Sequence, residues 1–573
     1  MAMSNDMGGN VVAMESSQTI SIVPENGEQF SPGQKIIYNI EPEVGYLKRD
    51  SYLIFDIVSD SAEKGLWTFA KNAGVHSIID QINIYSKETG ILLESLPNYS
   101  QWVSIENQYL YDDPTQLQLK EGVGHPLKAK DIRTKSDGTV IYEPSRPHGG
   151  HTANSQLCPQ NTSGAVQQLT RRFTMRLKSG VFNYWDDEKL IPVLNFGGLR
   201  IEIFLQKPEL ALQKVAPHVE CANKAGYENY ERSYDLCNSE TNSADTPALN
   251  ILSADDTAKT LVINLNGGGV MPTGVFPNAL SLADEAENPI GFSSLGLGVG
   301  NKIDIINKDT NNLRVQATIS ELTASVAGVA NDVNGASVMT IKCAGADFSA
   351  VVATDYIKVA EAPSYKVKST EFRLCQVVPP PNVANSLMKG LNYEFTSYDV
   401  FLNNIPTGVL RHQVPITSVA SKATAVFTHY HDANKVENKD APNYYDGLAP
   451  EEFNLNSVQY FINNRLYPLR EYNPQATKDR CLNQNELVKA WKAIGKLPIN
   501  LGDGERQGLN GYANSYLTSR ELAREGFVFD LRNAEPEIRL KFSGSRTNIV
   551  RANTYVFSKK IIQSTATGVQ VIL

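Results

Sequence analysis

Short segments in which apolar and polar residues alternate dominate this chain of 573 residues. In the segment LRIEIFL at 199–205, three apolar side chains alternate with Arg200 and Glu202, which is the period of a half-buried β-strand. Clusters of Gly, Asn and Pro separate such segments, and helical segments do not alternate with them. The pattern therefore predicts an all-β sandwich or barrel. Further segments of this kind lie at 35–40, 51–59, 78–85, 172–180, 371–378, 422–431, 457–466, 537–544 and 554–562.

The predicted strands occur in the same order twice. In both copies the hairpin is followed by a polar stretch that predicts a helix carrying a tryptophan, Trp102 in the first copy and Trp491 in the second. A repeated order of elements predicts two sandwiches in tandem. The matched segments are 51–59 with 422–430, 77–94 with 456–471, 197–206 with 535–544, and 369–378 with 552–562.

The first copy contains a long segment that has no counterpart in the second. It lies between Gln206 and Tyr365, so we predict an insertion over 207–364 in a loop of the first sandwich. Its part from 250 to 362 contains short alternating segments such as TLVINL and DYIKVAEA, which are enough for a small barrel. A loop of this length is uncommon in a compact domain unless it has a function or folds by itself.

Helical patterns are few. In NQNELVKAWKAIG, Leu487, Trp491 and Ile494 share one face and Gly495 stands at the C-cap. A second, shorter helix is predicted at 382–390, directly after three prolines. The predicted organisation is a flexible arm at 1–17, a first sandwich at 18–385 interrupted by the insertion at 207–364 with its β-rich part at 250–362, a Pro-rich linker and short helix at 379–391, and a second sandwich at 392–573.

Composition excludes several classes of protein. The hydrophobic fraction is 41% and the charged fraction 20%, and no apolar run approaches the roughly 18 residues of a membrane span. The N-terminal sequence lacks the pattern of a signal peptide, so we expect synthesis in a reducing intracellular compartment. The six cysteines have neither the spacing of a zinc site nor that of a disulfide framework; they are Cys158, Cys221, Cys237, Cys343, Cys375 and Cys481.

The charge distribution argues against binding of nucleic acid by the N-terminal arm. The net charge is −9, and the first basic residue is Lys35. Neutralising phosphates requires clustered Lys and Arg side chains. We therefore expect no sequence-specific contact with nucleic acid.

Two histidine pairs are candidate metal ligands. His429 and His431 lie two residues apart on a predicted strand, so both point to one face and could bind a metal ion with Asp432 or a distant carboxylate. A polar strand face is the favoured interpretation. His148 and His151 in RPHGGH could meet on a loop, but no Cys or Glu stands at zinc spacing, so a plain loop is favoured.

Other motifs do not indicate catalysis. NGGG at 266–269 is followed by neither GK[ST] nor a helix and indicates a turn. The acidic run Asp186, Asp187 and Glu188 is contiguous, whereas a glycosidase needs two carboxylates across a cleft. Cys375 lies on an apolar strand, where we expect an inert core residue. We therefore assign no catalytic, cofactor-binding or metal-binding residue and predict that the chain is not an enzyme.

Two strings in the sequence resemble a known family. They are P-x-x-x-x-G-G-L-R-I-E-I at 192–203 and E-F-R-L-C-x-V-V-P-P-P at 371–381. Together with the tandem sandwiches, the linker and the insertion, they resemble the double jelly-roll major capsid proteins of tailless double-stranded DNA viruses, in particular those of virophages and polinton-like viruses. The resemblance covers most of the chain from residue 18 onward.

The resemblance implies two eight-stranded jelly rolls and a homotrimer that forms a pseudo-hexagonal capsomer of an icosahedral virion shell. The implied partners are neighbouring capsomers, penton and minor capsid proteins, and a host receptor at the insertion. The resemblance also implies that the chain is made and assembled inside the host cell and is located in the virion capsid. The alternative is a carbohydrate-binding or carbohydrate-active β-sandwich protein, because jelly rolls also occur in lectins and hydrolases. The repeated strand order and the lack of a catalytic pair favour the capsid protein.

Overall fold

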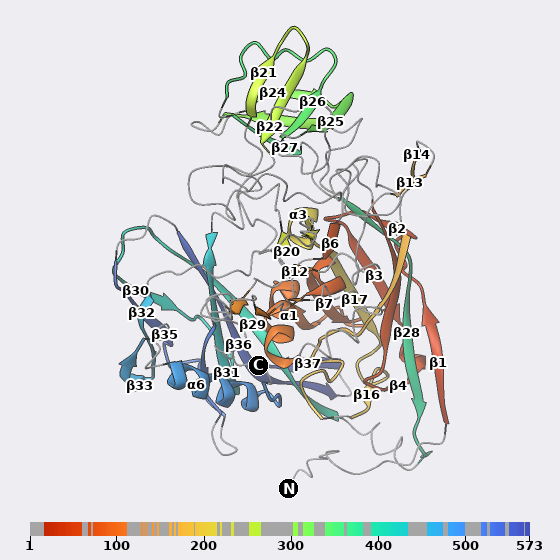
Figure 1. The fold of residues 1–573 in the computed structure, drawn as a ribbon. Coiled ribbons are helices and arrows are strands. Elements are labelled where there is room, and N and C mark those ends of the chain that lie inside the picture. Colours follow the sequence, from red (N-terminus) through yellow and green to blue (C-terminus); the bar gives the residue numbers. More distant parts are fainter. Residues whose placement is uncertain are drawn as a thin grey trace.

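Two β-sandwiches and a smaller β-rich part make up the computed structural model of the chain (Figure 1). The sandwiches lie side by side, and the smaller part lies beyond one end of them. The described residues are 16–59, 67–69, 73–111, 128–129, 132–134, 140–142, 146–147, 160–162, 165–167, 170–187, 189–214, 218–220, 231–233, 251–264, 302–307, 313–325, 338–353, 355–359, 364–381, 391–433, 455–473, 480–498, 517–523, 528–544, 549–565 and 568–573.

The first sandwich consists of two antiparallel sheets. Strand β17 coincides with the strand predicted at 199–205, and its alternation places Leu199, Ile201 and Ile203 in the core. One sheet contains, in spatial order, β1 (Ser16–Ile22), β28 (Tyr365–Val378), β5 (Tyr52–Ser59) and β15 (Thr170–Met175), with the short strands β2 (Gln29–Phe30), β4 (Tyr46–Leu47) and β16 (Ile191–Pro192) at its margins. The other contains β3 (Lys35–Ile40), β17 (Leu199–Leu205), β7 (Ile79–Ser86) and β8 (Leu92–Leu96).

The second sandwich is also built from two antiparallel sheets. One contains β29 (Leu391–Ile405), β36 (Val550–Thr565), β31 (Ala423–Asp432) and β34 (Leu517–Glu521), and the C-terminal strand β37 (Gly568–Ile572) pairs with β36. The other contains β30 (Arg411–Pro415), β35 (Glu537–Phe542), β32 (Leu455–Ile462) and β33 (Arg465–Tyr472). All of these strand pairs are antiparallel.

The two sandwiches have the same topology. When the eight long strands of each are numbered in chain order, one sheet has the order 1-8-3-6 and the other 2-7-4-5 in both sandwiches. Each is therefore an eight-stranded jelly roll, and the predicted correspondence of strands is confirmed. The match of 197–206 with 535–544 identifies the right strands but is offset by one residue, because inward-facing Leu199 was set against outward-facing Glu537.

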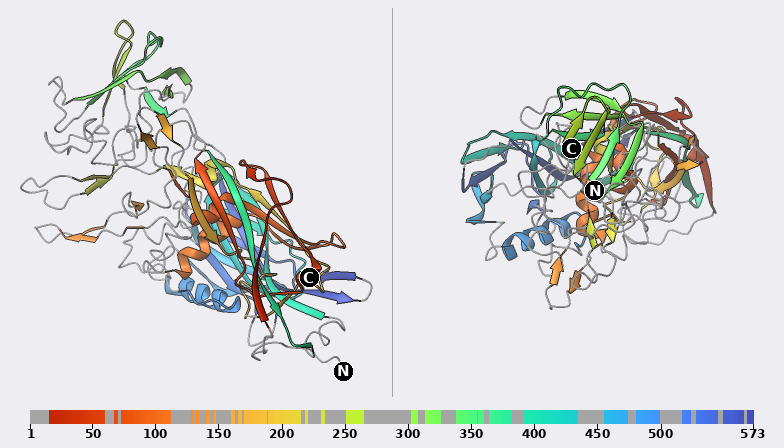
Figure 2. Two further views of the ribbon diagram at one scale, coloured as in Figure 1. Left: turned by 90° about the vertical axis from the view of Figure 1, so that its right-hand side faces the viewer. Right: turned by 45° about the horizontal axis from the view of Figure 1, so that its top comes forward.

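The insertion predicted at 207–364 lies between β17 and β28 and contains its own sheets. The left view of Figure 2 shows these sheets, coloured green, beyond one end of the jelly rolls. Its N-terminal part also adds β18 (Leu212–Lys214) to β6 (Trp67–Phe69) of the first jelly roll. The sheets are β21 (Ile251–Asp255), β22 (Thr260–Asn264), β26 (Val338–Lys342) and β25 (Glu321–Ser325), and β24 (Leu313–Thr318), β23 (Lys302–Ile306) and β27 (Tyr356–Val359).

The two predicted tryptophan helices are present. They are α1 (Tyr99–Leu110) and α6 (Arg480–Ala493), and Gly495 after α6 has a φ of +73°, as expected at a helix C-terminus. The remaining short elements are η1 (Pro42–Val44), η2 (Gly74–Ile78), β9 (Lys128–Ala129), β10 (Ile132–Thr134), β11 (Val140–Tyr142), β12 (Arg146–Pro147), β13 (Gln160–Thr162), β14 (Ala165–Gln167), α3 (Pro208–Ala211), β19 (His218–Glu220) and β20 (Glu231–Ser233).

The boundary predicted for the N-terminal arm is two residues too long. Ser16 and Ser17 belong to β1, where they pair with Val378 and Val377. The reason is that β28 extends far enough to offer them backbone partners, which composition alone does not reveal. The rest of the arm and the short helix predicted at 382–390 lie outside the described residues.

A cluster of aromatic side chains joins the two jelly rolls. The rings of Trp102 and Trp491 lie 5.6 Å apart between centroids, and both side chains are fully buried. Trp102 on α1 also contacts Phe557 on β36 of the second jelly roll, at 4.8 Å. One hydrophobic core therefore runs from the first jelly roll into the second. We call this cluster the aromatic junction: Trp102, Trp185, Tyr398, Phe427, Trp491, Tyr555 and Phe557.

We expect Trp102→Ala and Trp491→Ala each to lower the free energy of unfolding by about 3–5 kcal/mol, because each leaves a cavity in a closed core. In the double variant the two losses should not add, and the coupling should be about 1 kcal/mol, because the rings contact each other. Denaturant unfolding measures all three. Leu469→Ala is the control, since that side chain is 87% exposed. Strict additivity would contradict a direct coupling of the two helices.

Candidate functional site

Buried polar contacts fix the two jelly rolls at the aromatic junction. The carboxylate of Glu94 on β8 accepts hydrogen bonds from the backbone N–H of Gly180 at 2.9 Å and of Val181 at 3.2 Å, and from the hydroxyl of Ser179. It also accepts one from Ser397 on β29 of the second jelly roll, at 2.6 Å. Burial raises the pKa of Glu94, and these hydrogen bonds oppose that shift. One side chain thus satisfies donors from both jelly rolls.

The turn after β15 makes further contacts of this kind. Asp186 accepts hydrogen bonds from the backbone N–H of Thr396 at 2.6 Å and from its hydroxyl at 2.8 Å. The hydroxyl of Tyr393 donates to Val181 O at 2.9 Å. A methyl group on Gly180 would lie 2.0 Å from the carbonyl oxygen of Thr396, so the two backbones meet there without room for a side chain. The turn is therefore a docking element for β29.

A buried ion pair lies beside this turn. The ammonium of Lys178 lies 2.8 Å from a carboxylate oxygen of Glu106 on α1, and both side chains are almost inaccessible to solvent. The indole N–H of Trp185 donates to the other oxygen of Glu106 at 3.1 Å. The ammonium of Lys178 also donates a hydrogen bond to the side-chain oxygen of Asn107, at 2.6 Å. Because every charge has partners, the pair is tolerated in the core and fixes α1 against the turn.

The acidic run predicted at 186–188 does not form a catalytic pair among the described residues. Asp186 is held by Thr396, and Glu188 lies outside the described part. His148, His151 and the NGGG segment also lie outside it. Cys375 is half-buried rather than a core residue, because it lies on the outward side of β28, opposite Thr19. Burial raises its pKa, which makes the thiol a poor nucleophile.

His429 and His431 lie on β31, as predicted, but on a buried face. Their rings stack with centroids 5.6 Å apart, and each residue is at most 3% exposed. Neither ring nitrogen of His431 has a hydrogen-bond partner among the described residues. Arg551 on β36 is its register neighbour. No group of three His, Cys, Asp or Glu side chains suited to a metal ion occurs in the described residues.

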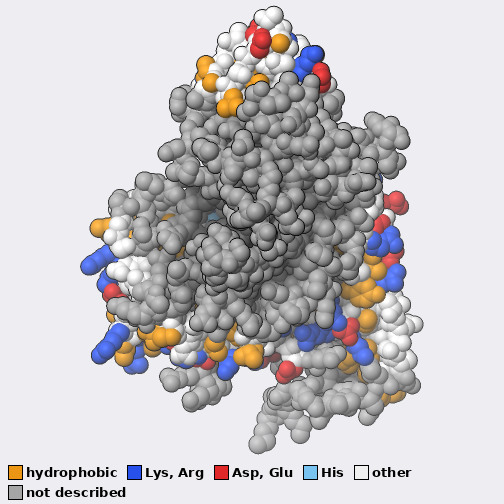
Figure 3. Space-filling view, viewed as in Figure 1, with side chains coloured by type: hydrophobic (Ala, Val, Ile, Leu, Met, Phe, Trp, Pro, Cys, Tyr) orange, Lys and Arg blue, Asp and Glu red, His pale blue; other side chains and the backbone are white. Residues whose placement is uncertain are grey.

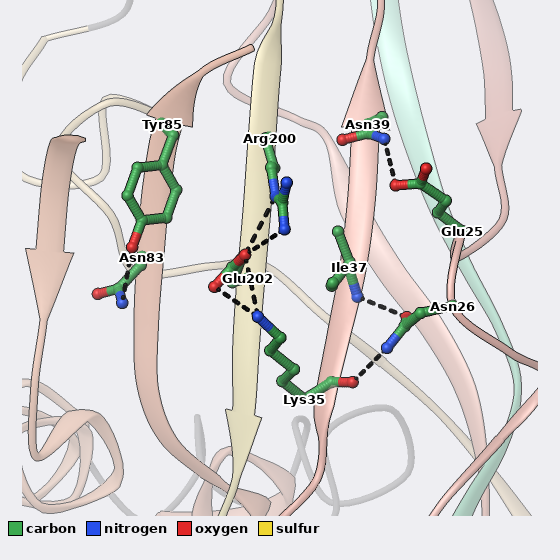
Figure 4. Close-up of polar contacts among 9 residues, drawn as sticks. All are labelled: Glu25, Asn26, Lys35, Ile37, Asn39, Asn83, Tyr85, Arg200 and Glu202. Atoms are coloured by element: carbon green, nitrogen blue, oxygen red, sulfur yellow. Dashed lines mark hydrogen bonds and ion pairs between the residues drawn. The ribbon is translucent and has the colours of Figure 1, made fainter. Parts of the chain in front are cut away.

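A polar network lies on an outer face of the first jelly roll. On the first, Glu202 accepts from Arg200 at 2.7 Å and from Lys35 at 3.3 Å, and Asn26 binds the backbone of β3 (Figure 4). On the face of the molecule shown in Figure 3, described basic and acidic side chains are interspersed rather than gathered into a basic block. No helix in the described part of the chain is both long and apolar enough to cross a membrane.

The sequence matches no protein-family model and no curated protein. Solved structures do match it. The Faustovirus major capsid protein is 8% identical in sequence and superimposes with a TM-score of 0.50, and the match covers 99% of this chain and 93% of the Faustovirus chain. The major capsid protein of mavirus is 12% identical with 99% and 92% coverage and a TM-score of 0.43, and a chain of the Sputnik virophage is 12% identical with 100% and 91% coverage and a TM-score of 0.45.

The Faustovirus match extends over both jelly rolls, and the repeated strand order agrees with it. This chain has the double jelly-roll fold of viral major capsid proteins. The fold class expected from the sequence is thereby confirmed. The contacts of Glu94, Asp186 and Gly180 then have a clear role, because they hold the two halves of the double jelly roll in one fixed arrangement.

The histidine pair lies on the sheet of the double jelly roll that is buried on both faces. Burial lowers the pKa of His431 well below its ordinary value of 6.5, and the positive charge on His429 and Arg551 would lower it further. Below pH 6.5 the unfolded chain therefore binds a proton at His431 that the folded chain does not bind. The titration of His431 leaves the free energy of unfolding unchanged above pH 6.5 and lowers it as the pH drops below that value.

We expect the free energy of unfolding of the native chain to fall between pH 6 and pH 5 by about 1.4 kcal/mol more than that of His431→Gln, which lacks this titration. Denaturant titrations at both pH values measure the difference. His412→Gln, a single histidine removed from β30, is the matched control. An identical pH dependence in the native chain and His431→Gln would show that His431 does not refuse a proton in the fold.

Proposed function

We propose that this chain is a major capsid protein, that three copies form a pseudo-hexagonal capsomer, and that capsomers tile an icosahedral virion shell. The observation that carries the proposal is the duplication of one eight-stranded topology within a single chain. Three such chains supply six similar jelly rolls, which have nearly the outline of a hexamer although the symmetry is threefold. Neighbouring capsomers, penton proteins and minor capsid proteins are the partners that such a shell requires.

The junction supports this proposal because a tile must keep its shape. The two jelly rolls share one hydrophobic core, and Glu94 and Asp186 bind backbone or hydroxyl groups of β29. Hinge motion would separate these carboxylates from their partners on β29, at a cost of about 1–3 kcal/mol each. A carbohydrate-active protein would instead need a pair of carboxylates free to reach a ligand, and Asp186 is bound to Thr396.

We propose that the insertion forms a crown on the outer face of the capsomer and that it contacts a host receptor. It leaves after β17 and returns before β28, so it projects from one end of the first jelly roll (Figure 1). Only the outside of a shell has unrestricted space for three copies. Exposed apolar side chains on the crown offer contact area for a partner: Leu252, Leu313 and Val352 are 45%, 56% and 47% exposed.

We expect the purified chain to have three times its monomer mass in solution, because three copies make up the proposed capsomer. Size-exclusion chromatography with light scattering measures the mass, and negative-stain electron microscopy checks for pseudo-hexagonal outlines and, at higher concentration, shells. A monomer or dimer under all conditions would overturn the proposal.

Replacing residues 250–362 by a short Gly/Ser linker should preserve the trimer and reduce attachment to host cells. Ile251 at the start of the crown donates a backbone hydrogen bond to Asp355 near its end, at 2.8 Å, so a short linker can close the gap. Trimer mass and cell attachment are the two measurements. Loss of the folded trimer would show that the crown belongs to the core or to the trimer contact, and unchanged attachment would exclude the receptor role.

A further inference from the structure

Strand β1 forms one edge of the first jelly roll. All seven of its residues pair in unbroken register with β28, from Ser16 opposite Val378 to Ile22 opposite Phe372. In the described part of the chain, β28 is the only strand that pairs with it. Figure 1 shows β1 at the outer margin of the molecule. Its second edge therefore presents backbone N–H and C=O groups outward.

Edge strands normally carry a feature that prevents pairing with another chain, such as a charge or a proline. Of the sixteen long strands of the two jelly rolls, eight lie at the edge of a sheet. Six of them, β3, β15, β29, β30, β33 and β34, contain at least one charged residue, and β8, whose only charge is the buried Glu94, is bound to β29 of the second jelly roll. Strand β1, with the sequence SSQTISI, contains no charge, no proline and no bulge.

The side chains of β1 are also compatible with pairing. Ile20 and Ile22 pack on the core, whereas Ser17, Thr19 and Ser21 are exposed. Strand β37 is uncharged too, but it is shorter, begins at Gly568, and lies against Thr89 of the first jelly roll. Among the described edge strands of the jelly rolls, only β1 is long, uncharged and open along its second edge.

We propose that β1 pairs with β1 of a second copy of this chain, antiparallel across a twofold axis. With Thr19 opposite its own copy, Ser17 faces Ser21 and Gln18 faces Ile20, so no like charges meet and small side chains face small side chains. The sequence is thus compatible with itself in this register, and the two sheets continue into one. Backbone hydrogen bonds supply the affinity, as in other cases of strand addition.

The symmetry of this contact decides which copies it joins. An antiparallel pair of identical strands is isologous and has twofold symmetry, whereas neighbours within a threefold trimer meet through different surfaces. The β1 contact therefore joins one trimer to the next rather than chains within a trimer. This step rests on the proposed function, since it names a contact between capsomers.

Cysteine cross-linking tests the register. Ser17→Cys and Ser21→Cys proteins, mixed and oxidised at assembly concentration, should give a disulfide-linked dimer on non-reducing gels, because directly opposed strand positions have the Cα separation that a disulfide needs. Each variant alone should give little dimer, since each cysteine then faces a serine. The native cysteines are present in every sample and serve as the control. Equal dimer yields from the mixture and from the single variants would overturn the register.

A charge substitution tests which copies are joined. Thr19→Lys places two like charges opposite each other on the axis, so it should leave trimers intact and reduce trimer–trimer association at least tenfold by light scattering. Thr407→Lys, in the exposed β29–β30 turn, is the matched control. Loss of the trimer, or unchanged association, would overturn the β1 contact. Cross-linked dimers without any trimer would support the strand pairing while refuting the proposed capsomer.

Discussion

The contact of α1 and α6 with the sheet β29–β36–β31–β34 is the constraint on which the rest of the double jelly roll depends. That sheet is buried on both faces, because its inner side belongs to the core of the second jelly roll and its outer side to the aromatic junction. On β31, Val426 and Tyr430 point inward while Phe427 points to Trp491, 4.8 Å away. The residues on both faces of this sheet must therefore be largely apolar or aromatic. This restricts the sequence of its strands more than that of an ordinary half-exposed strand.

Apolar packing alone would not fix how the two jelly rolls are oriented. Hydrophobic burial is not directional, so the aromatic junction would tolerate small rotations. The polar contacts with β29 remove that freedom, because Glu94 and Asp186 retain their partners on that strand in one arrangement only. Removing the Ser397 hydroxyl would leave the buried Glu94 without one of its donors and cost about 1–3 kcal/mol. We interpret these groups as orientation devices for the two halves.

The strand order, the repeat and the two tryptophan helices could be predicted from the sequence because they are written in local periodicity. The junction could not. Glu94 and Ser397 are 303 positions apart, and nothing near Glu94 in the sequence distinguishes it from an exposed carboxylate on an edge strand. His429 and His431 were correctly placed on one strand face, but their burial depends on which elements cover that face. The offset between β17 and β35 has the same origin, since only the packed structure defines the inward residues.

The two jelly rolls have one topology but not one surface, and this difference bears on assembly. The outer face of the first carries the Glu202 network, in which an acidic side chain is enclosed by Lys35 and Arg200. The corresponding face of the second carries Arg539 stacked on Phe461, 4.0 Å from the ring centroid. In the proposed trimer, six jelly rolls from three chains would therefore alternate in chemistry around the ring. A neighbouring molecule that binds the outer face of one jelly roll would meet a different face on the next jelly roll. Its contacts would therefore repeat three times rather than six times around the ring.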